Sequence, residues 1–271
     1  MIKIGKMMKT LVACGMVLSL ALGMVGCKKS GQSALDRIKQ SGKLVLGTCA
    51  DYPPYEFHKT TNGNDEIIGF DVEIAKAIAD ELGVKLEIKD MKFDGLLPAL
   101  KTNNIDLIVA GMNITPERQK QVDFSKLYYT AKQAVVVRKE DKDKFDSLEA
   151  LSGKKIGVQK SSTQETIAKD SIKDAQLTSL GKVTDLMLEV KNKKVDGILV
   201  VDEVAKAYVN KNDDLAIAGA VFKDADDSSA IAVNKGNGDL IDVINKVIDK
   251  LNSQNKITDW VTQYNDVAQQ D

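Results

Sequence analysis

One arginine stands where a buried strand gives way to a predicted helix. In residues 110–118 (AGMNITPER) a threonine directly precedes a proline, which is the pattern of a helix N-terminus. Arg118 then lies in the first helical turn, close to backbone N–H groups near Gly111 and Asn113. A guanidinium presents a planar fork of donors and a helix N-terminus carries positive partial charge, so this segment suits a carboxylate.

A second group of polar residues stands in the later half of the chain. Residues 160–164 (KSSTQ) again lie between a predicted strand and the start of a predicted helix. Asp202 follows the apolar run 197–201 (GILVV), and its carboxylate can accept hydrogen bonds from an ammonium group. The first half of the sequence therefore offers hydrogen-bond donors for an anion. The second half offers further donors and, in Asp202, an acceptor for a cation.

Composition argues against several other kinds of chemistry. The chain has 271 residues and a single histidine, His58, which disfavours a histidine-rich metal site or a Ser-His-Asp triad. Lys plus Arg (38) nearly balances Asp plus Glu (39), so there is no charge excess for binding nucleic acid. No G-x-x-x-x-G-K-[ST] sequence is present, so we expect no ATP hydrolysis, and we also expect no metal and no cofactor.

Alternating strand-like and helix-like runs position the arginine loop. The predicted strands are 43–48 (KLVLGT), 84–88 and 105–110, and the predicted helices are 70–82 and 94–100. A β-α-β-α-β order with short connections favours a parallel sheet covered by helices. Ligands of such sheets bind beyond the carboxyl ends of the strands, where the loop of Arg118 lies.

A second series of elements begins at residues 134–138 (AVVVR). It continues with strands at 155–158 and 195–201 and with helices near 147–151, after Ser162, at 184–191 and from Asp202. A late strand at 230–233 precedes two closing helices, 239–251 and one around Trp260. We expect an α/β fold of two lobes, each a mostly parallel sheet flanked by helices, joined by two hinge crossings. The predicted division is 41–130 with 226–271 for lobe 1 and 131–225 for lobe 2.

The first residues read as an export signal. Residues 1–26 combine three lysines with an uncharged apolar stretch that is shorter than a membrane-spanning helix needs. They end before Cys27 in a sequence that resembles a lipobox, with Met24 where leucine is usual, so we expect Cys27 to be acylated; an ordinary signal peptide is the alternative. Residues 27–40 would tether the domain. The mature chain then has 35 basic and 39 acidic side chains, and Cys49 is its remaining thiol.

Seven segments together resemble one protein family. They are 47–57 (GTCADYPPYEF), 67–83 (IIGFDVEIAKAIADELG), 93–100 (FDGLLPAL), 110–118 (AGMNITPER), 122–130 (VDFSKLYYT), 162–166 (STQET) and 200–205 (VVDEVA). In this order they resemble the polar amino-acid-binding proteins of ABC importers, which are extracytoplasmic solute-binding proteins with the type II periplasmic-binding fold. The resemblance covers essentially all of residues 41–271.

The resemblance implies how the polar head of a free L-amino acid is held. Arg118 would bind the α-carboxylate through two hydrogen bonds, helped by donors at Asn113 and Thr163. Asp202, together with the carbonyl group of Gly111, would hold the α-ammonium group. The two charged ends of the ligand would therefore contact both lobes.

The resemblance also places residues around the ligand side chain. Tyr52 and Phe93 stand where the family usually sandwiches that side chain, and further lining positions are Ala110, Gln159 and Gln164. Family members that bind lysine, arginine or histidine often carry aspartate at the position of Cys49, so the cysteine removes a charge. Glu56 or Asp51 can replace this charge. The ligand therefore stays open between arginine or lysine and a polar uncharged amino acid such as glutamine or cystine.

The implied function is binding, without catalysis. The lobes would close on the amino acid and present it to a membrane permease, whose ATPase subunit supplies the energy. A monomer suffices for this, anchored to the outer face of the cell membrane through lipid on Cys27. Two alternatives remain: a cyclohexadienyl or arogenate dehydratase of similar fold, with Glu56 or Glu165 as general acid, and a stand-alone extracellular sensor or adhesin.

Overall fold

The computed structural model describes residues 32–223 and 225–269. The predicted signal peptide of residues 1–26 and the predicted acylation site Cys27 lie outside these ranges. From Ser33 onward the described chain forms a single unit by its contacts. No helix within the described ranges is long and apolar enough to cross a membrane.

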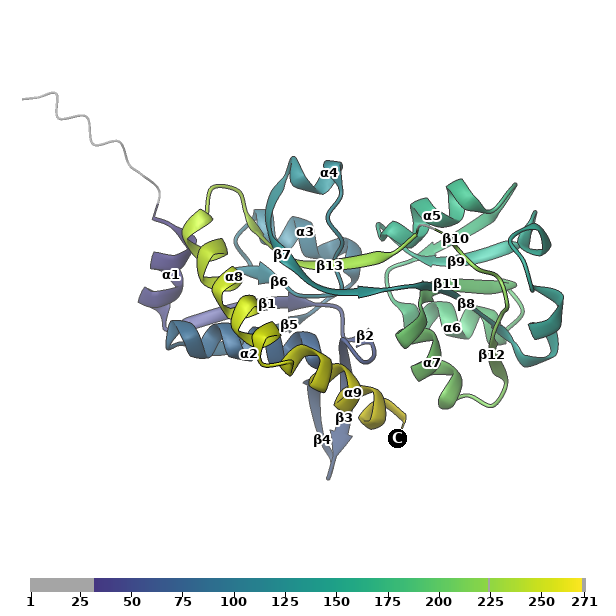
Figure 1. The fold of residues 1–271 in the computed structure, drawn as a ribbon, viewed down its shortest axis with the longest axis horizontal. Helices are drawn as coiled ribbons and strands as arrows, with labels where there is room; N and C mark the ends of the chain where they lie inside the picture. The colour runs from purple at the N-terminus through teal and green to yellow at the C-terminus, as the bar shows by residue number, and fades with distance from the viewer. Residues whose placement is uncertain (1–31, 224, 270–271) are drawn as a thin grey trace, which may run out of the picture. The chain divides into compact units, whose positions relative to one another are not determined.

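The first lobe is built on a five-stranded mixed sheet (Figure 1). Its strands, in spatial order, are β5 (Lys85–Asp90), β1 (Lys43–Thr48), β6 (Leu107–Ile108), β13 (Asp227–Asn234) and β7 (Val122–Ala131). β1 pairs in parallel with β5 and β6, whereas β13 pairs antiparallel with β6 and β7. The late strand therefore returns to the lobe that the early strands began, as the sequence pattern predicts.

The second lobe repeats this arrangement. Its strands, in spatial order, are β10 (Gln176–Leu180), β9 (Lys155–Gln159), β11 (Gly197–Val201), β8 (Gln133–Arg138) and β12 (Leu215–Ile217). β9 pairs in parallel with β10 and β11, while β8 pairs antiparallel with β11 and β12. The chain passes between the lobes twice, from β7 to β8 at Lys132 and from β12 back to β13.

Helices cover both sheets. Those of the first lobe are α1 (Ala34–Ser41), α2 (Phe70–Leu82), α3 (Phe93–Lys101), α8 (Gly238–Ser253) and α9 (Lys256–Gln269), and those of the second are α5 (Thr163–Ser171), α6 (Val183–Lys191) and α7 (Asp202–Asn210). In Figure 1, α8 and α9 (yellow) lie beside α2, and all three contact one another. Phe70, Ile74 and Ile78 of α2 are fully buried because their spacing places them on one helix face.

The helix α1 occupies the second half of the segment, residues 27–40, that the sequence pattern assigns to the tether. The side chain of Ser33 caps it by accepting a hydrogen bond from the backbone N–H of Asp36. Ala34 and Ile38 are buried, and the N–H of Ala34 donates to Oδ1 of Asn237 at 2.8 Å. Residues 34–40 therefore pack on the first lobe, because two apolar side chains one turn apart suffice to dock a short amphipathic helix.

Several short elements differ from the sequence-based prediction. A three-stranded antiparallel sheet of β2 (Asp51–Tyr52), β3 (Glu56–Thr61) and β4 (Asn64–Ile68) is present where no strands are expected. Much of β3 and β4 is exposed and polar, so the alternation of apolar residues that marks a strand is weak there. The helix expected near residues 147–151 is a single 3₁₀ turn, Glu149–Leu151.

Candidate functional site

Arg118 is positioned by a short capped helix. α4 (Pro116–Gln119) starts with proline at its first position, and Oγ1 of Thr115 accepts a hydrogen bond from the N–H of Arg118 at 3.2 Å. This confirms the predicted helix start. Proline presets the backbone angle of the first turn and the threonine satisfies one of its free N–H groups, so the local sequence alone directs the chain here.

The guanidinium of Arg118 is buried between the two lobes. Nη1 donates to the carbonyl oxygen of Asn113 at 2.8 Å, and Nη2 donates to the carbonyl oxygen of Ser161, in the second lobe, also at 2.8 Å. The guanidinium carbon lies 5.6 Å from the ring centroid of Phe93. Burial lowers the pKa of Arg118 to about 10, and the charge of Asp227 opposes this shift, so the guanidinium stays charged at neutral pH.

The second lobe contributes polar side chains from the start of α5. Oγ1 of Thr163 donates to Oδ1 of Asn113 at 2.8 Å, which joins two residues predicted to contact the same carboxylate. Nε2 of Gln164 donates to Oδ2 of Asp227 at 2.7 Å, and both side chains are buried. Asp227 is not a predicted site residue. It lies in a polar stretch with neighbouring acids, and no spacing distinguishes the one that becomes buried.

The two predicted aromatic residues both lie at the junction of the lobes. The hydroxyl oxygen of Tyr52 accepts a hydrogen bond from the N–H of Val201 at 3.4 Å, and the N–H of Phe93 donates to the carbonyl oxygen of Gly181 at 3.3 Å. Gly111 has a φ of 55°, and a Cβ added there would lie 3.6 Å from the Tyr52 ring. That distance is ordinary contact, so it is the left-handed backbone conformation that favours glycine at this position.

Cys49 is a buried thiol in this junction. Its Sγ donates to Oδ1 of Asp51 at 3.3 Å, and Nε2 of Gln159 donates to Sγ at 3.7 Å. Burial raises the pKa of the Cys49 thiol, and the negative charges of Asp51 and Glu56 raise it further. The thiol therefore stays protonated at neutral pH, which disfavours a role as a nucleophile. Ala110 packs in the same apolar cluster as Cys49 and Phe93.

The two acids considered as replacements for the charge missing at Cys49 have different surroundings. Oδ2 of Asp51 accepts a hydrogen bond from the N–H of Val183, at the start of α6, at 2.6 Å, so this carboxylate lies beside the thiol and faces the second lobe. Burial raises the pKa of Asp51 to about 6. Glu56 is hydrogen bonded instead to Asp71 within the first lobe. Of the two acids, Asp51 is the one with a contact in the second lobe.

Glu56 and Asp71 form a buried pair of carboxyl groups behind the Arg118 loop. Oδ2 of Asp71 accepts hydrogen bonds from the N–H of Gly111 at 2.9 Å and from the hydroxyl of Tyr128 at 2.8 Å. Burial raises the pKa of Asp71 to about 7. Burial also raises the pKa of Glu56 well above its usual value, and the negative charge of Asp71 adds to that shift. As carboxylates, Oε2 of Glu56 and Oδ1 of Asp71 have no hydrogen-bond partner among the described residues, and a proton shared between the two groups would supply one.

This pair predicts that stability falls as pH rises. Both pKa values lie above those of an unfolded chain, so the stabilising proton is present in acid and is lost as pH rises through about 7. We expect the melting temperature of the ligand-free protein to fall between pH 5.5 and 8.5. The Glu56→Gln variant should flatten this dependence by about 1 kcal/mol or more, which is about 2–4 °C.

Thermal unfolding followed by circular dichroism at several pH values measures this dependence. Glu66→Gln serves as the matched control because Glu66 is an exposed acid on β4, and its pH profile should follow that of the wild type. Identical pH profiles for Glu56→Gln and the wild type would contradict the shared proton.

Asp202 lies at the start of α7. Its N–H donates to the carbonyl oxygen of Lys132 at 2.9 Å, and its Oδ2 pairs with Nζ of Lys206 at 2.9 Å. Its buried Oδ1 has no hydrogen-bond donor among the described residues unless the neighbouring Glu203 is protonated, and burial together with the contact to Asp202 raises the pKa of Glu203 to about 7. The preceding residue, Val201, bonds to Tyr52, which links Asp202 to the site through the backbone. No described hydrogen bond joins the Asp202 carboxylate directly to another predicted site residue.

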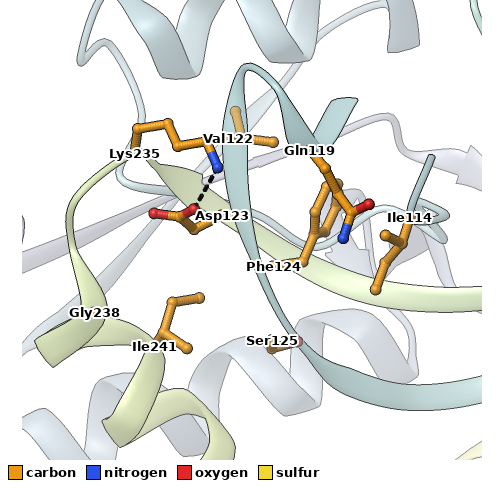
Figure 2. A pocket seen from close by; sticks show the side chains of 9 residues that line it. All are labelled: Ile114, Gln119, Val122, Asp123, Phe124, Ser125, Lys235, Gly238 and Ile241. Atoms are coloured by element: carbon orange, nitrogen blue, oxygen red, sulfur yellow. Dashed lines mark hydrogen bonds and ion pairs between the residues drawn. The ribbon is translucent and has the colours of Figure 1, made fainter. Parts of the chain in front are cut away.

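Two pockets are lined in part by residues that neighbour Arg118 in the sequence. One, of about 770 Å³, opens beside Asn113 and Thr163, between α4 and α5. The other, of about 470 Å³, lies between β7 and the start of α8 and is shown in Figure 2. None of the predicted ligand contacts lines this second pocket. Its charged side chains, Asp123 and Lys235, pair with each other at 2.7 Å, so it offers no unpaired charge to an amino acid.

The chain is similar to named amino-acid-binding proteins. The arginine-binding extracellular protein ArtP of Bacillus subtilis is 38% identical over 245 residues, which are 89% of this chain and 91% of that protein. The solved structure of AbpA, an amino acid ABC transporter substrate-binding protein of Streptococcus pneumoniae bound to L-arginine, has 39% identity and a TM-score of 0.84. That alignment covers 87% of this chain and 99% of AbpA.

A second solved structure bears on the enzyme alternative. The ancestral amino-acid-binding protein AncCDT-1, a precursor of cyclohexadienyl dehydratase, has 34% identity and a TM-score of 0.76, covering 86% of this chain and 99% of that one. It too is named for binding an amino acid. Residues 44–267 match the bacterial extracellular solute-binding proteins, family 3. With this match across both lobes, the chain belongs to the bacterial extracellular solute-binding proteins of family 3.

Proposed function

We propose that this protein captures L-arginine, or a closely similar basic L-amino acid, between its two lobes and delivers it to an ABC permease. The observation that carries the proposal is the buried guanidinium of Arg118, which is held at the lobe junction by Asn113 and Ser161. The named relatives support arginine as the ligand, since ArtP is arginine-binding and AbpA is bound to L-arginine. Both relatives are named as binding proteins, AbpA as that of an ABC transporter, and this protein is likewise not an enzyme.

The two charged groups of the ligand bind residues of both lobes. The α-carboxylate binds Arg118 and the donors at Asn113 and Thr163, while the α-ammonium group binds Asp202 and the carbonyl of Gly111. The Asp202 carboxylate lies beside the carboxyl group of Glu203, and an ammonium group bound there would offset the repulsion between the two acids. Closure excludes water and strengthens both charge pairs. The ligand stabilises the closed arrangement because it binds that arrangement more tightly than the open one.

The ligand side chain lies between Tyr52 and Phe93, with Ala110, Gln159, Gln164 and Cys49 lining the rest. Near the ligand side chain, the buried carboxyl group of Asp51 lies beside Cys49, whereas Arg118 and Asp202 bind the polar head of the ligand. An acid at that end favours a ligand with a cationic side chain over a neutral one. Asp51, beside Cys49, then provides the carboxylate that many basic-amino-acid binders carry at the position of the cysteine itself.

The remaining features concern location and partners. Residues 1–26 act as a signal peptide, and Cys27 is acylated and holds the protein on the outer face of the cell membrane. A permease and its ATPase subunit accept the ligand from a monomeric binding protein. The ABC transporter named with AbpA supports these partners. A sensor or adhesin role has no comparable support.

Thermal shift tests the proposed ligand. Addition of L-arginine at about 100 times its dissociation constant should stabilise the ligand-stripped protein by about 2.7 kcal/mol, or about 5–10 °C for a domain of this size. L-Lysine should give a smaller shift and L-glutamine little. Agmatine, which lacks the carboxylate, is the matched control for Arg118 and should fail. A shift with glutamine or cystine and none with arginine would reassign the ligand. No shift with any amino acid would overturn the proposal.

A further inference from the structure

One buried carboxylate, that of Asp227, gathers polar side chains from both lobes. Only 3% of this residue is exposed. Its Oδ1 accepts a hydrogen bond from Nδ2 of Asn113 at 2.7 Å, and its Oδ2 accepts from Nε2 of Gln164 at 2.7 Å and from Nε2 of Gln133 at 3.2 Å. Oγ1 of Thr163 lies 3.5 Å from Oδ2.

These partners come from different parts of the fold. Asn113 belongs to the loop before α4 in the first lobe, and Gln164 belongs to α5 in the second. Gln133 begins β8, next to one crossing, and Asp227 begins β13, where the other crossing ends. A single carboxylate at the crossings therefore bonds to a residue of each lobe. The arrangement depends on how the lobes meet, because Thr163 also donates to Asn113 across the junction.

The bonds to Asp227 determine which way the amide groups point. An amide that turns its NH₂ group toward the carboxylate must direct its oxygen elsewhere. Oδ1 of Asn113 consequently accepts from Oγ1 of Thr163 at 2.8 Å. Without the carboxylate, both amides could rotate, and the geometry of Asn113 and Thr163 around the ligand carboxylate would no longer be unique.

Asp227 also differs from a direct ligand contact. Three amide donors occupy its two oxygens, so its hydrogen-bonding capacity is largely used within the protein. Its charge acts on Arg118 from a distance and no described ion pair joins the two groups. A satisfied carboxylate of this kind orients its neighbours and does not itself bind the ligand.

We propose that Asp227 is a positioning residue of the amino-acid site, which orients Asn113 and Gln164 from opposite lobes so that the ligand carboxylate meets Arg118 and Thr163 in one arrangement. This inference rests on the proposed function. It predicts a contribution to affinity that does not depend on the side chain of the ligand.

The Asp227→Asn variant tests this role by calorimetric titration. Asparagine has nearly the same shape but brings an NH₂ group against the amide donors, so one or more of these bonds must break. We expect the affinity for arginine and for lysine to fall about 10- to 100-fold, by the same factor for both, with a faster dissociation rate. Asp226→Asn, which removes the neighbouring and less buried acid, should bind like the wild type.

A second variant separates positioning from a general structural role. In Asp227→Asn combined with Gln164→Glu, the carboxylate and the amide exchange places and their hydrogen bond can form again. We expect this double variant to recover at least half of the lost binding free energy. Circular dichroism of each ligand-free variant establishes whether it folds.

The outcomes are distinct. Wild-type affinity for Asp227→Asn, unequal losses for arginine and lysine, or no recovery in the double variant would each overturn the positioning role. If neither variant folds, Asp227 serves the fold as a whole and the inference is wrong. A wild-type protein that binds no amino acid at all would instead show that the proposed function has failed.

Discussion

Arg118→Ala is expected to weaken arginine binding by about 30-fold to several thousand-fold, which corresponds to about 2–5 kcal/mol. The guanidinium is 6% exposed and already donates to the carbonyl oxygens of Asn113 and Ser161. A ligand carboxylate bound there is removed from water, so loss of the guanidinium leaves a buried anion without its partner. Alanine also leaves two carbonyl groups of the site unpaired.

Two further variants make this result specific. Arg118→Lys keeps the charge but loses the planar fork, and we expect an affinity between those of the wild type and Arg118→Ala. Lys120→Ala is the matched control, since it removes one exposed positive charge two residues away and should change affinity less than about threefold. Isothermal titration calorimetry on folded variants measures these effects. Wild-type-like binding by Arg118→Ala would refute the assigned role.

Asp202→Asn should produce the second large loss, toward the lower end of about 2–5 kcal/mol. The carboxylate is partly exposed and pairs with Lys206, so it is less completely removed from water than Arg118. Its Oδ1 is nevertheless buried beside the carboxyl group of Glu203, so an ammonium group there would meet two acids. Asparagine keeps the shape and removes the charge, so the loss reports the charge itself.

Lys206→Met is the matched control for Asp202. It removes the ion-pair partner and leaves the carboxylate, and an exposed ion pair contributes little. We expect arginine affinity to stay within about threefold of the wild type or to increase, because the carboxylate then has no competing cation. If Lys206→Met lost more arginine affinity than Asp202→Asn, then Asp202 would act through its ion pair with Lys206 and would not bind the ligand directly.

Elements with strong local signals were predictable. The strand Lys43–Thr48 and the helix Phe70–Leu82 have the predicted bounds, since their apolar residues repeat at the period of the element. Strands β3, β4 and β7 escaped prediction. β3 and β4 present polar side chains to solvent, and β7, which lies at a sheet edge, alternates less clearly. Their pairing depends on partners that the local sequence does not identify.

In the candidate site, too, some features follow from the local sequence and others depend on distant residues. The start of α4, and with it the placement of Arg118 behind a buried strand, follows from Thr115 and Pro116. The burial of Asp227 does not follow from its own neighbours, because an acid beside other acids in a polar stretch ordinarily faces water. It becomes buried only when Asn113 and Gln164 supply donors from distant parts of the chain.

The sequence by itself determined the alternation of strands and helices, the capped turn that presents Arg118, and the resemblance from which the family follows. These depend on periods of two to four residues and on caps, which act over a few bonds of the chain. The tertiary structure decided that Asp51 faces the second lobe, that Glu56 and Asp71 are buried together, and that Asp227 joins both lobes. Each is a buried carboxyl group, and its charge and partners depend on burial by residues far away in the sequence.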